Sequence, residues 1–348
     1  MKKIACFLVI LANMFVSKSV NNEGYNQYIN KSYIVMNATN NEIIEGKDVN
    51  LIRSVASVSK IMTAIVAIEE GDLDKEVTIS KEDIDTYGSS IYLQENQKIK
   101  LIDLLYGLML RSGNDASNAI ARAVGGTREH FIEMMNNKAK QIGMKNSTFN
   151  NPSGLDVDET GNLSTSYDLA LLMSYAIKNN TFLKISSSKE YKNDKFVWSN
   201  KNKLLKTYKY TIAGKTGFTY KAKRTLVTAA RKDETTFVIV SLDCGNDFNF
   251  HKFLYERNFE KYESKLLLEK GDNYLEEYDV VCENDVYVTI NKNEIDEYSL
   301  VYKLKDSKAR VYLMTNDSEK EVATCSFKVL DTKMSKKSFI KRIKDWFK

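Results

Sequence analysis

The chain has 348 residues, of which 43% are hydrophobic and 28% charged, and its formal net charge is +5. This length allows a well-buried core and favours two folded units, and low-complexity segments and internal repeats are absent. Beyond the N-terminal segment, no run approaches the roughly 20 apolar residues that a transmembrane helix needs.

Residues 1–19 predict an export signal. Two lysines precede an apolar stretch over 4–16, and the small residues Ser17 and Ser19 follow it. The alternative is an amphipathic first helix. With a signal, the mature protein would work outside the cytoplasm.

Charge is unevenly distributed along the chain. Residues 333–348 carry seven Lys or Arg against one Asp, a charge of +6. Once the three lysines of the signal are removed, the body over 20–332 carries about −4. The body is therefore not expected to bind nucleic acid.

Cysteine usage argues against both a disulfide framework and a zinc site. Cys6 lies in the signal, and the remaining Cys244, Cys282 and Cys325 show no Cys-x-x-Cys spacing. We expect Cys282 and Cys325 to be buried thiols, with a bond between them as the alternative.

The elements in chain order predict an α+β fold. Two strands over 32–37 and 42–46 form a hairpin before the helix that holds Ser57, and an apolar period from Leu101 predicts a further helix. More helices are expected at 115–124, 127–142 and 166–179, then the strands "RTLVTAAR" and "TTFVIVSLD", then a helix ending near Tyr262.

Strands at both ends of a helical region indicate one antiparallel sheet covered by helices, with a helical subdomain. We place this domain at residues 24–260. The short alternating strands that follow predict a small all-β domain over 265–330.

Ser57 and Lys60, in "SVSK", are candidates for a nucleophile and its base. Three residues apart on a helix, they share a face with Cβ atoms about 5–6 Å apart. A serine needs such a base, and a lysine serves only when burial or a nearby positive charge keeps it neutral. The spacing recurs at 186–189 and 338–341, so what singles out Ser57 is its place at a helix start after a hairpin.

Two further short motifs follow Ser57 and Lys60 along the chain. Ser112 and Asn114 lie between two helical patterns, and this motif taken alone favours a helix stop at Gly113 with Asn114 or Asp115 capping the next helix. Lys215, with Thr216 and Gly217 after it, precedes strand-forming residues, where a turn at the glycine is the alternative.

Ser-x-x-Lys, Ser-x-Asn and Lys-Thr-Gly, in this order, form the set found in penicillin-binding proteins and class A β-lactamases. The chain resembles the serine D-alanyl-D-alanine carboxypeptidases, the low-molecular-mass penicillin-binding proteins. The resemblance covers roughly residues 32–245 and includes "ASVSKIMTA", "GSSIYL", "DLLYGLMLRSGNDAS", "NPSGLD" and "GKTGFT".

The resemblance implies that Ser57 attacks the peptide carbonyl between two D-alanines and forms an acyl-enzyme that water hydrolyses. Lys60 would be the base, and Ser112 would pass a proton to the leaving nitrogen. The backbone N–H groups of Ser57 and Phe218 would hold the oxyanion.

The remaining residues would bind the substrate, a peptidoglycan stem peptide, and β-lactam antibiotics would act as covalent inhibitors. The Asn114 amide would bind the peptide backbone. Lys215 and Thr216 would bind the terminal carboxylate, and Lys215 would also help to keep Lys60 neutral. Gly217 would allow close backbone approach. No cofactor is expected.

Other functions remain as alternatives. A β-lactamase of class A needs a deacylating Glu about 34 residues after Ser-x-Asn, where this chain has Thr148, and Glu159 is the nearest acid. Endopeptidase or transpeptidase action shares the acyl-enzyme chemistry, and an inactive wall-peptide binding protein is the alternative from another class. His130 and His251 are expected to be surface or packing residues rather than triad or metal groups.

Two positions depart from the family pattern, and they put substrate preference and turnover rate in doubt. Ala222 and Lys223 stand where the family usually reads Ala-Gly, and Asn162 and Leu163 stand where it often has a His before Ser-Thr.

Residues 333–348 predict a basic amphipathic helix that lies on a membrane surface, because their aromatic and apolar residues fall on one helical face. The alternative is a helix packed on the β domain.

Overall fold

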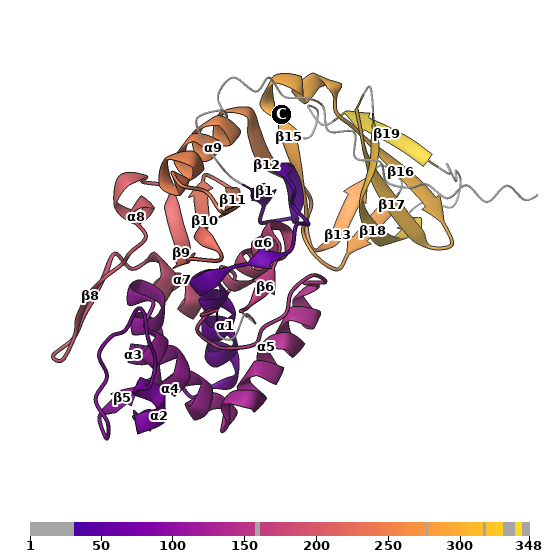
Figure 1. Ribbon diagram of the computed structural model, residues 1–348. Helices are drawn as coiled ribbons and strands as arrows, with labels where there is room; N and C mark the ends of the chain where they lie inside the picture. The colour runs from indigo at the N-terminus through magenta and orange to yellow at the C-terminus, as the bar shows by residue number, and fades with distance from the viewer. Residues whose placement is uncertain (1–30, 157–160, 276–277, 316–317, 330–337, 343–348) are drawn as a thin grey trace, which may run out of the picture.

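The computed structural model describes residues 31–156, 161–275, 278–315, 318–329 and 338–342. Figure 1 shows a mixed helix and sheet region that holds the first two thirds of the chain, with an all-β region beside it. This confirms the α+β class. No helix within the described ranges is long and apolar enough to span a membrane. The boundaries 24–260 and 265–330 stay predictions.

The central sheet is antiparallel and is assembled from both ends of its region, in the order β2-β1-β11-β10-β9. The strands are β1 (Ser32–Asn37), β2 (Glu42–Lys47), β9 (Thr211–Thr219), β10 (Lys223–Lys232) and β11 (Thr235–Leu242). The predicted hairpin and the two later strands are confirmed.

Both faces of this sheet are covered. Alternate side chains point to opposite faces of a strand, so Val35 packs with α9 (Asp247–Lys261) while Ile34 packs with α1 (Lys60–Glu70) and α6 (Ser166–Ala176). This explains why β1 and β11 are apolar without alternation. Figure 1 shows α9 on the side of the sheet away from α1 and α6.

The helical subdomain comprises α2 (Lys81–Ile84), α3 (Leu101–Tyr106), α4 (Asn114–Gly125) and α5 (Arg128–Ile142). The helix expected from Leu101 passes into a π-helical turn, η3 (Gly107–Arg111), which ends at Ser112. The remaining helices, α7 (Asn180–Ser187) and α8 (Leu204–Thr207), follow α6.

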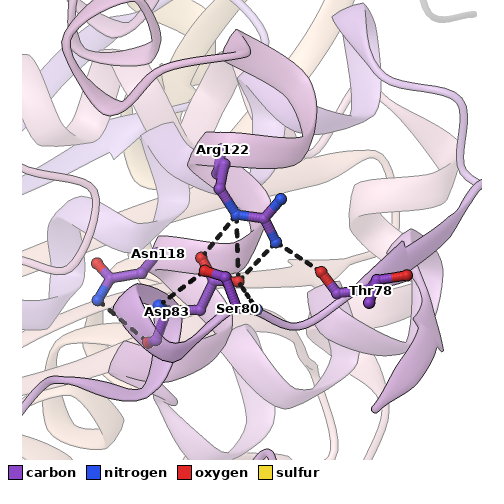
Figure 2. Close-up of polar contacts among 5 residues, drawn as sticks. All are labelled: Thr78, Ser80, Asp83, Asn118 and Arg122. Atoms are coloured by element: carbon purple, nitrogen blue, oxygen red, sulfur yellow. Dashed lines mark hydrogen bonds and ion pairs between the residues drawn. The ribbon is translucent and has the colours of Figure 1, made fainter. Parts of the chain in front are cut away.

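A partly buried ion pair between Asp83 and Arg122 ties α2 to α4 (Figure 2). The Asp83 carboxylate is buried and accepts hydrogen bonds from Arg122 Nε at 3.1 Å and Nη2 at 2.6 Å. Arg122 also donates to the Thr78 carbonyl at 2.7 Å, and Ser80 caps α2 through Asp83. The segment before the cleft is therefore anchored to the helix that begins with Asn114.

Short two-stranded ribbons complete this region: β3 (Arg53–Ser54) with β6 (Leu163–Ser164), β4 (Glu76–Thr78) with β5 (Lys98–Lys100), and β7 (Glu190–Lys192) with β8 (Val197–Ser199).

The all-β region pairs β12 (Tyr262–Leu268) with β15 (Val286–Asn291) beside a six-stranded sheet. Its strands are, in order, β13 (Gly271–Leu275), β14 (Tyr278–Cys282), β18 (Glu319–Val329), β17 (Lys308–Met314), β16 (Ser299–Lys305) and β19 (Ser338–Arg342). A disulfide joins Cys282 to Cys325, so the expectation of two thiols is wrong. The pairing of β14 with β18 brings the two cysteines together, with Cα atoms 4.7 Å apart.

The helix predicted for residues 333–348 is also wrong where the structure describes that segment. Residues 338–342 form β19, which pairs antiparallel with β16. Without β19, strand β16 would be the edge of the sheet and its backbone N–H and C=O groups would be unpaired. Pairing with residues 338–342 satisfies these groups, and the apolar spacing within the segment contains no information about this partner. The other residues of the predicted helix lie outside the described ranges.

The two regions meet along β1 and β2. Asn37 is buried, and its amide donates to Ser264 Oγ and Thr289 Oγ1, both at 2.8 Å. Lys320 pairs with Glu42 at 2.6 Å.

Candidate active site

Ser57 and Lys60 lie at the start of α1. The structure places Ser57 in a 3-10 turn, η2 (Ala56–Ser59), rather than in the α-helix itself, and Lys60 is the first residue of α1. Lys60 Nζ lies 3.2 Å from Ser57 Oγ. The predicted contact of hydroxyl and amine is therefore present.

The amine of Lys60 has two further partners. Nζ lies 2.7 Å from Asn114 Oδ1 and also contacts the carbonyl of Ser153. A neutral amine has two N–H groups and one lone pair. With the two oxygens accepting its N–H groups, the lone pair is directed to the Ser57 hydroxyl, the arrangement that a general base requires.

Burial is the main reason that Lys60 can be neutral. Its side chain is 0% exposed, and desolvation lowers its pKa well below the ordinary value. The charges of Lys215 and Lys201 lower this pKa further, while Asp115 raises it.

The second motif forms a tight turn beside the amine. Ser112 has a φ of 65°, in the left-handed region, and joins η3 to α4. Lys215 Nζ donates to Ser112 Oγ at 3.0 Å and to the Thr216 carbonyl at 2.8 Å. Lys215 is buried, and desolvation followed by the charge of Lys201 lowers its pKa to about 7.

Both the oxygen and the nitrogen of the Asn114 side-chain amide form hydrogen bonds. Oδ1 accepts from Lys60, Nδ2 donates to the Tyr87 carbonyl at 2.6 Å, and the backbone N–H donates to Ser89 at 2.7 Å. The same side chain that would bind substrate thus also orients the base.

Strand β9 runs directly past the nucleophile. A Cβ on Gly217 would lie 3.0 Å from the backbone nitrogen of Ser57 and 2.4 Å from Thr225 Oγ1. Glycine therefore allows the close approach, and Phe218, next along the strand, comes beside the same turn. On the other side, Gly154 has a φ of 81° and packs on Ala56.

These residues line one cleft of about 870 Å³. Its walls include Ser57, Ser112, Asn114, Thr216, Gly217 and Phe218. Lys60 and Lys215 lie buried behind them.

The sequence did not single out several groups of the cleft. Arg111, Lys201 and Lys203 line it, and none of the three forms an ion pair with a carboxylate within the described part of the chain. Lys201 Nζ donates to Ser89 Oγ at 2.9 Å, and burial lowers its pKa, as does the charge of Arg111. Lys201 carries no local sequence signal, and Ser153, although it lies in the family stretch "NPSGLD", was not assigned a role, because the contacts of both depend on loops returning to the site.

Neither histidine lies at the cleft. His130 is exposed near Glu133, and His251 is buried between Thr228 and Ser241. The expectation of surface and packing roles is confirmed. The described residues contain no cluster of three or more His, Cys, Asp or Glu that could hold a metal.

The model of the D-alanyl-D-alanine carboxypeptidase family matches residues 18–246, most of the chain. The chain belongs to this family. It is 31% identical to D-alanyl-D-alanine carboxypeptidase DacF of Bacillus subtilis over 254 residues, which cover 66% of this chain and 65% of that protein. It is 32% identical to a D-alanyl-D-alanine endopeptidase of Haemophilus influenzae, over 61% of this chain and 75% of the relative.

Among solved structures, penicillin-binding protein 5 from Haemophilus influenzae shares the fold. The TM-score is 0.77 at 24% identity, and the alignment covers 87% of this chain and 96% of that one. Because it extends over most of the chain, the likeness includes the all-β region.

The two departures from the family pattern have structural consequences. Lys223 has a φ of 59°, a conformation that favours glycine. Asn162 is buried, and its Oδ1 accepts from the backbone of Asn150 at 2.8 Å and Asn151 at 3.1 Å. Asn162 therefore supports the segment that carries Ser153.

The position of a class A deacylating acid is occupied by Thr148, whose backbone pairs with Leu163 at 2.9 and 3.0 Å. Glu159 lies outside the described residues.

Proposed function

We propose that the protein is a serine D,D-carboxypeptidase that removes the terminal D-alanine from peptidoglycan stem peptides. The observation that carries the proposal is the placement of the buried Lys60 amine between Ser57 Oγ, Asn114 Oδ1 and the Ser153 carbonyl.

In this proposal Ser57 Oγ attacks the carbonyl carbon and its proton passes to Lys60 Nζ. As the C–N bond breaks, Ser112, the hydrogen-bonded neighbour of Lys215, passes its proton to the leaving nitrogen and takes up the proton that Lys60 received from Ser57, so that Lys60 is neutral again. Water hydrolyses the resulting ester and regenerates Ser57. The N–H groups of Ser57 and Phe218 stabilise the oxyanion, which is typically worth about 3–4 kcal/mol per donor.

The charge of the cleft supports an anionic substrate. Since the pKa of Lys215 is about 7, this lysine is partly neutral at neutral pH. Arg111, Lys201 and Lys203 add further basic groups to the walls. A peptide that ends in a free carboxylate is attracted to such a cleft, and we propose that the Thr216 hydroxyl and Lys215 bind that carboxylate.

The test is release of D-alanine from a peptide ending in D-Ala-D-Ala, with Ser57→Ala as the inactive control. Intact mass after penicillin exposure, with peptide mapping, should place the adduct on Ser57. Unmodified protein and no D-alanine release would instead indicate an inactive wall-peptide binding protein.

A second candidate is endopeptidase action on cross-links, because the Haemophilus influenzae relative is a D-alanyl-D-alanine endopeptidase. Digestion of purified cross-linked dimers separates it from carboxypeptidase action. A β-lactamase would lose labelled penicillin within a short chase, whereas we expect a long-lived adduct.

We also propose that the protein is exported, with residues 1–19 as the signal, because its substrate lies outside the cytoplasm. This segment lies outside the described residues. The N-terminal sequence of the secreted protein is the direct measurement, and an intact Met1 on a cytoplasmic protein would contradict the proposal.

The tail contributes +6 over residues 333–348, and we propose that this charge draws the protein to anionic lipid, by about 1 kcal/mol per basic residue near the surface. Changing Lys336, Lys337 and Lys344 to Glu should abolish cosedimentation with anionic vesicles. Unchanged cosedimentation would contradict it.

A further inference from the structure

A bulky side chain stands at the cleft in an unfavourable backbone conformation. Tyr92 has a φ of 61°, its side chain is 83% exposed, and it lines the same cleft as Ser57. The left-handed region is rare for an aromatic residue. Such conformations persist where the surroundings impose them, and they collect at ligand sites.

The surroundings that impose this conformation come from the first turn of α4. The buried Asp115 carboxylate accepts hydrogen bonds from the backbone nitrogens of Ile91 and Leu93, both at 3.1 Å, on either side of Tyr92. It also accepts from Ser90 Oγ, which in turn accepts from the Tyr92 nitrogen at 2.8 Å. The backbone of Tyr92 is therefore fixed from the residue next to Asn114.

The side chain of Tyr92 contributes little to the packing of the fold. Its hydroxyl forms no hydrogen bond within the described part of the chain, and most of its surface faces solvent. Phe218 also lines the cleft and is 57% exposed. Exposed aromatic faces in a cleft gain free energy when an apolar group covers them.

We propose that Tyr92 is a specificity residue whose ring packs on the aliphatic side chain of the residue preceding the two D-alanines. This inference rests on the proposed function. In the proposed function, the reacting D-Ala-D-Ala unit would bind at Ser57, Ser112 and Thr216, which line the same cleft as Tyr92. Its methyl groups are short, so a side chain long enough to reach an exposed ring belongs to the preceding residue.

The test compares two peptides, diacetyl-lysyl-D-Ala-D-Ala and acetyl-alanyl-D-Ala-D-Ala. The wild type should favour the lysyl peptide by about 10-fold in kcat/KM, as expected for several buried methylenes. Tyr92→Ala and Tyr92→Gly should reduce this ratio to about 1, and Tyr92→Phe should retain it. Tyr175→Ala is the control, because Tyr175 lies on the surface of α6, where it contacts Glu69 and Lys138, and does not line the cleft.

Stability gives a second readout. Tyr92→Gly should melt at a higher temperature than Tyr92→Ala, since glycine adopts a positive φ without strain. A ratio that is unchanged in both variants, in an enzyme that releases D-alanine, would overturn the role of Tyr92 alone. Failure of the wild type to release D-alanine from either peptide would overturn the proposed function and this inference with it.

Discussion

The peptidase region buries two lysines whole, whereas the described residues of the all-β region bury no lysine or arginine. Lys60 and Lys215 lie beside the cleft with lowered pKa values, which costs folding free energy because burial disfavours the charged form that lysine has in the unfolded chain at neutral pH. The all-β region instead packs an apolar core that includes the Cys282–Cys325 disulfide. The two regions therefore differ in what they bury: the peptidase region buries lysines beside its cleft, and the all-β region buries apolar side chains and a disulfide.

The largest expected effect follows from replacing the buried amine. Lys60→Met should slow acylation by penicillin by about 1,000-fold, because the base is lost. It should also raise the melting temperature at pH 7, since a group with a lowered folded pKa destabilises the fold below its unfolded pKa of about 10.4. A mass time course and a thermal melt measure both. Normal acylation by the variant would refute Lys60 as the base.

In the all-β region, the second prediction concerns the disulfide, whose loss should lower stability and leave activity unchanged. Replacing Cys282 and Cys325 by Ser opens a loop with a sequence separation of 43 residues, which should destabilise the all-β region by about 4 kcal/mol. D-alanine release should be unchanged, because the cleft contains no residue of that region. Loss of activity in a variant that remains folded would show that the two regions are coupled.

Acid should weaken the peptidase region through His251, and the all-β region contains no histidine. Burial lowers the pKa of His251 to about 3, so the unfolded chain binds the extra proton between pH 6.5 and 3, and stability is lost as pH falls through that window. From pH 6.5 to 4 the loss is about 3 kcal/mol. Denaturant unfolding of wild type and His251→Gln should show the slope in the wild type alone, and equal slopes would contradict this account.

The smallest effect concerns the departure at Lys223. Because its φ is 59°, Lys223→Gly should stabilise the peptidase region by about 1 kcal/mol. Lys221→Gly in the same turn is the control, since it removes a lysine without that relief. Chemical denaturation measures the difference, and equal effects of the two changes would contradict the strain.

The sequence predicted the site well where a local motif was involved and poorly where a loop returns from a distance. Ser57 with Lys60, and Lys215 with Thr216, are read from spacing within one helix start and one strand. Ser153 and Lys201 come from segments whose arrival at the site depends on packing. The same limit explains why local alternation could not place Cys282 opposite Cys325.

Local pattern by itself determined the α+β class, the hairpin at 32–46, the C-terminal end of α5, the start of α6 and the three motifs, because capping, strand alternation and helical spacing act over a few residues. Tertiary structure alone decided that Lys60 is buried and desolvated, and that Asn114 and Ser153 orient its amine. It also decided how the backbone around Tyr92 is held at the cleft, and that residues 338–342 form a strand. Desolvation and strand pairing depend on neighbours far along the chain, and no local pattern contains them.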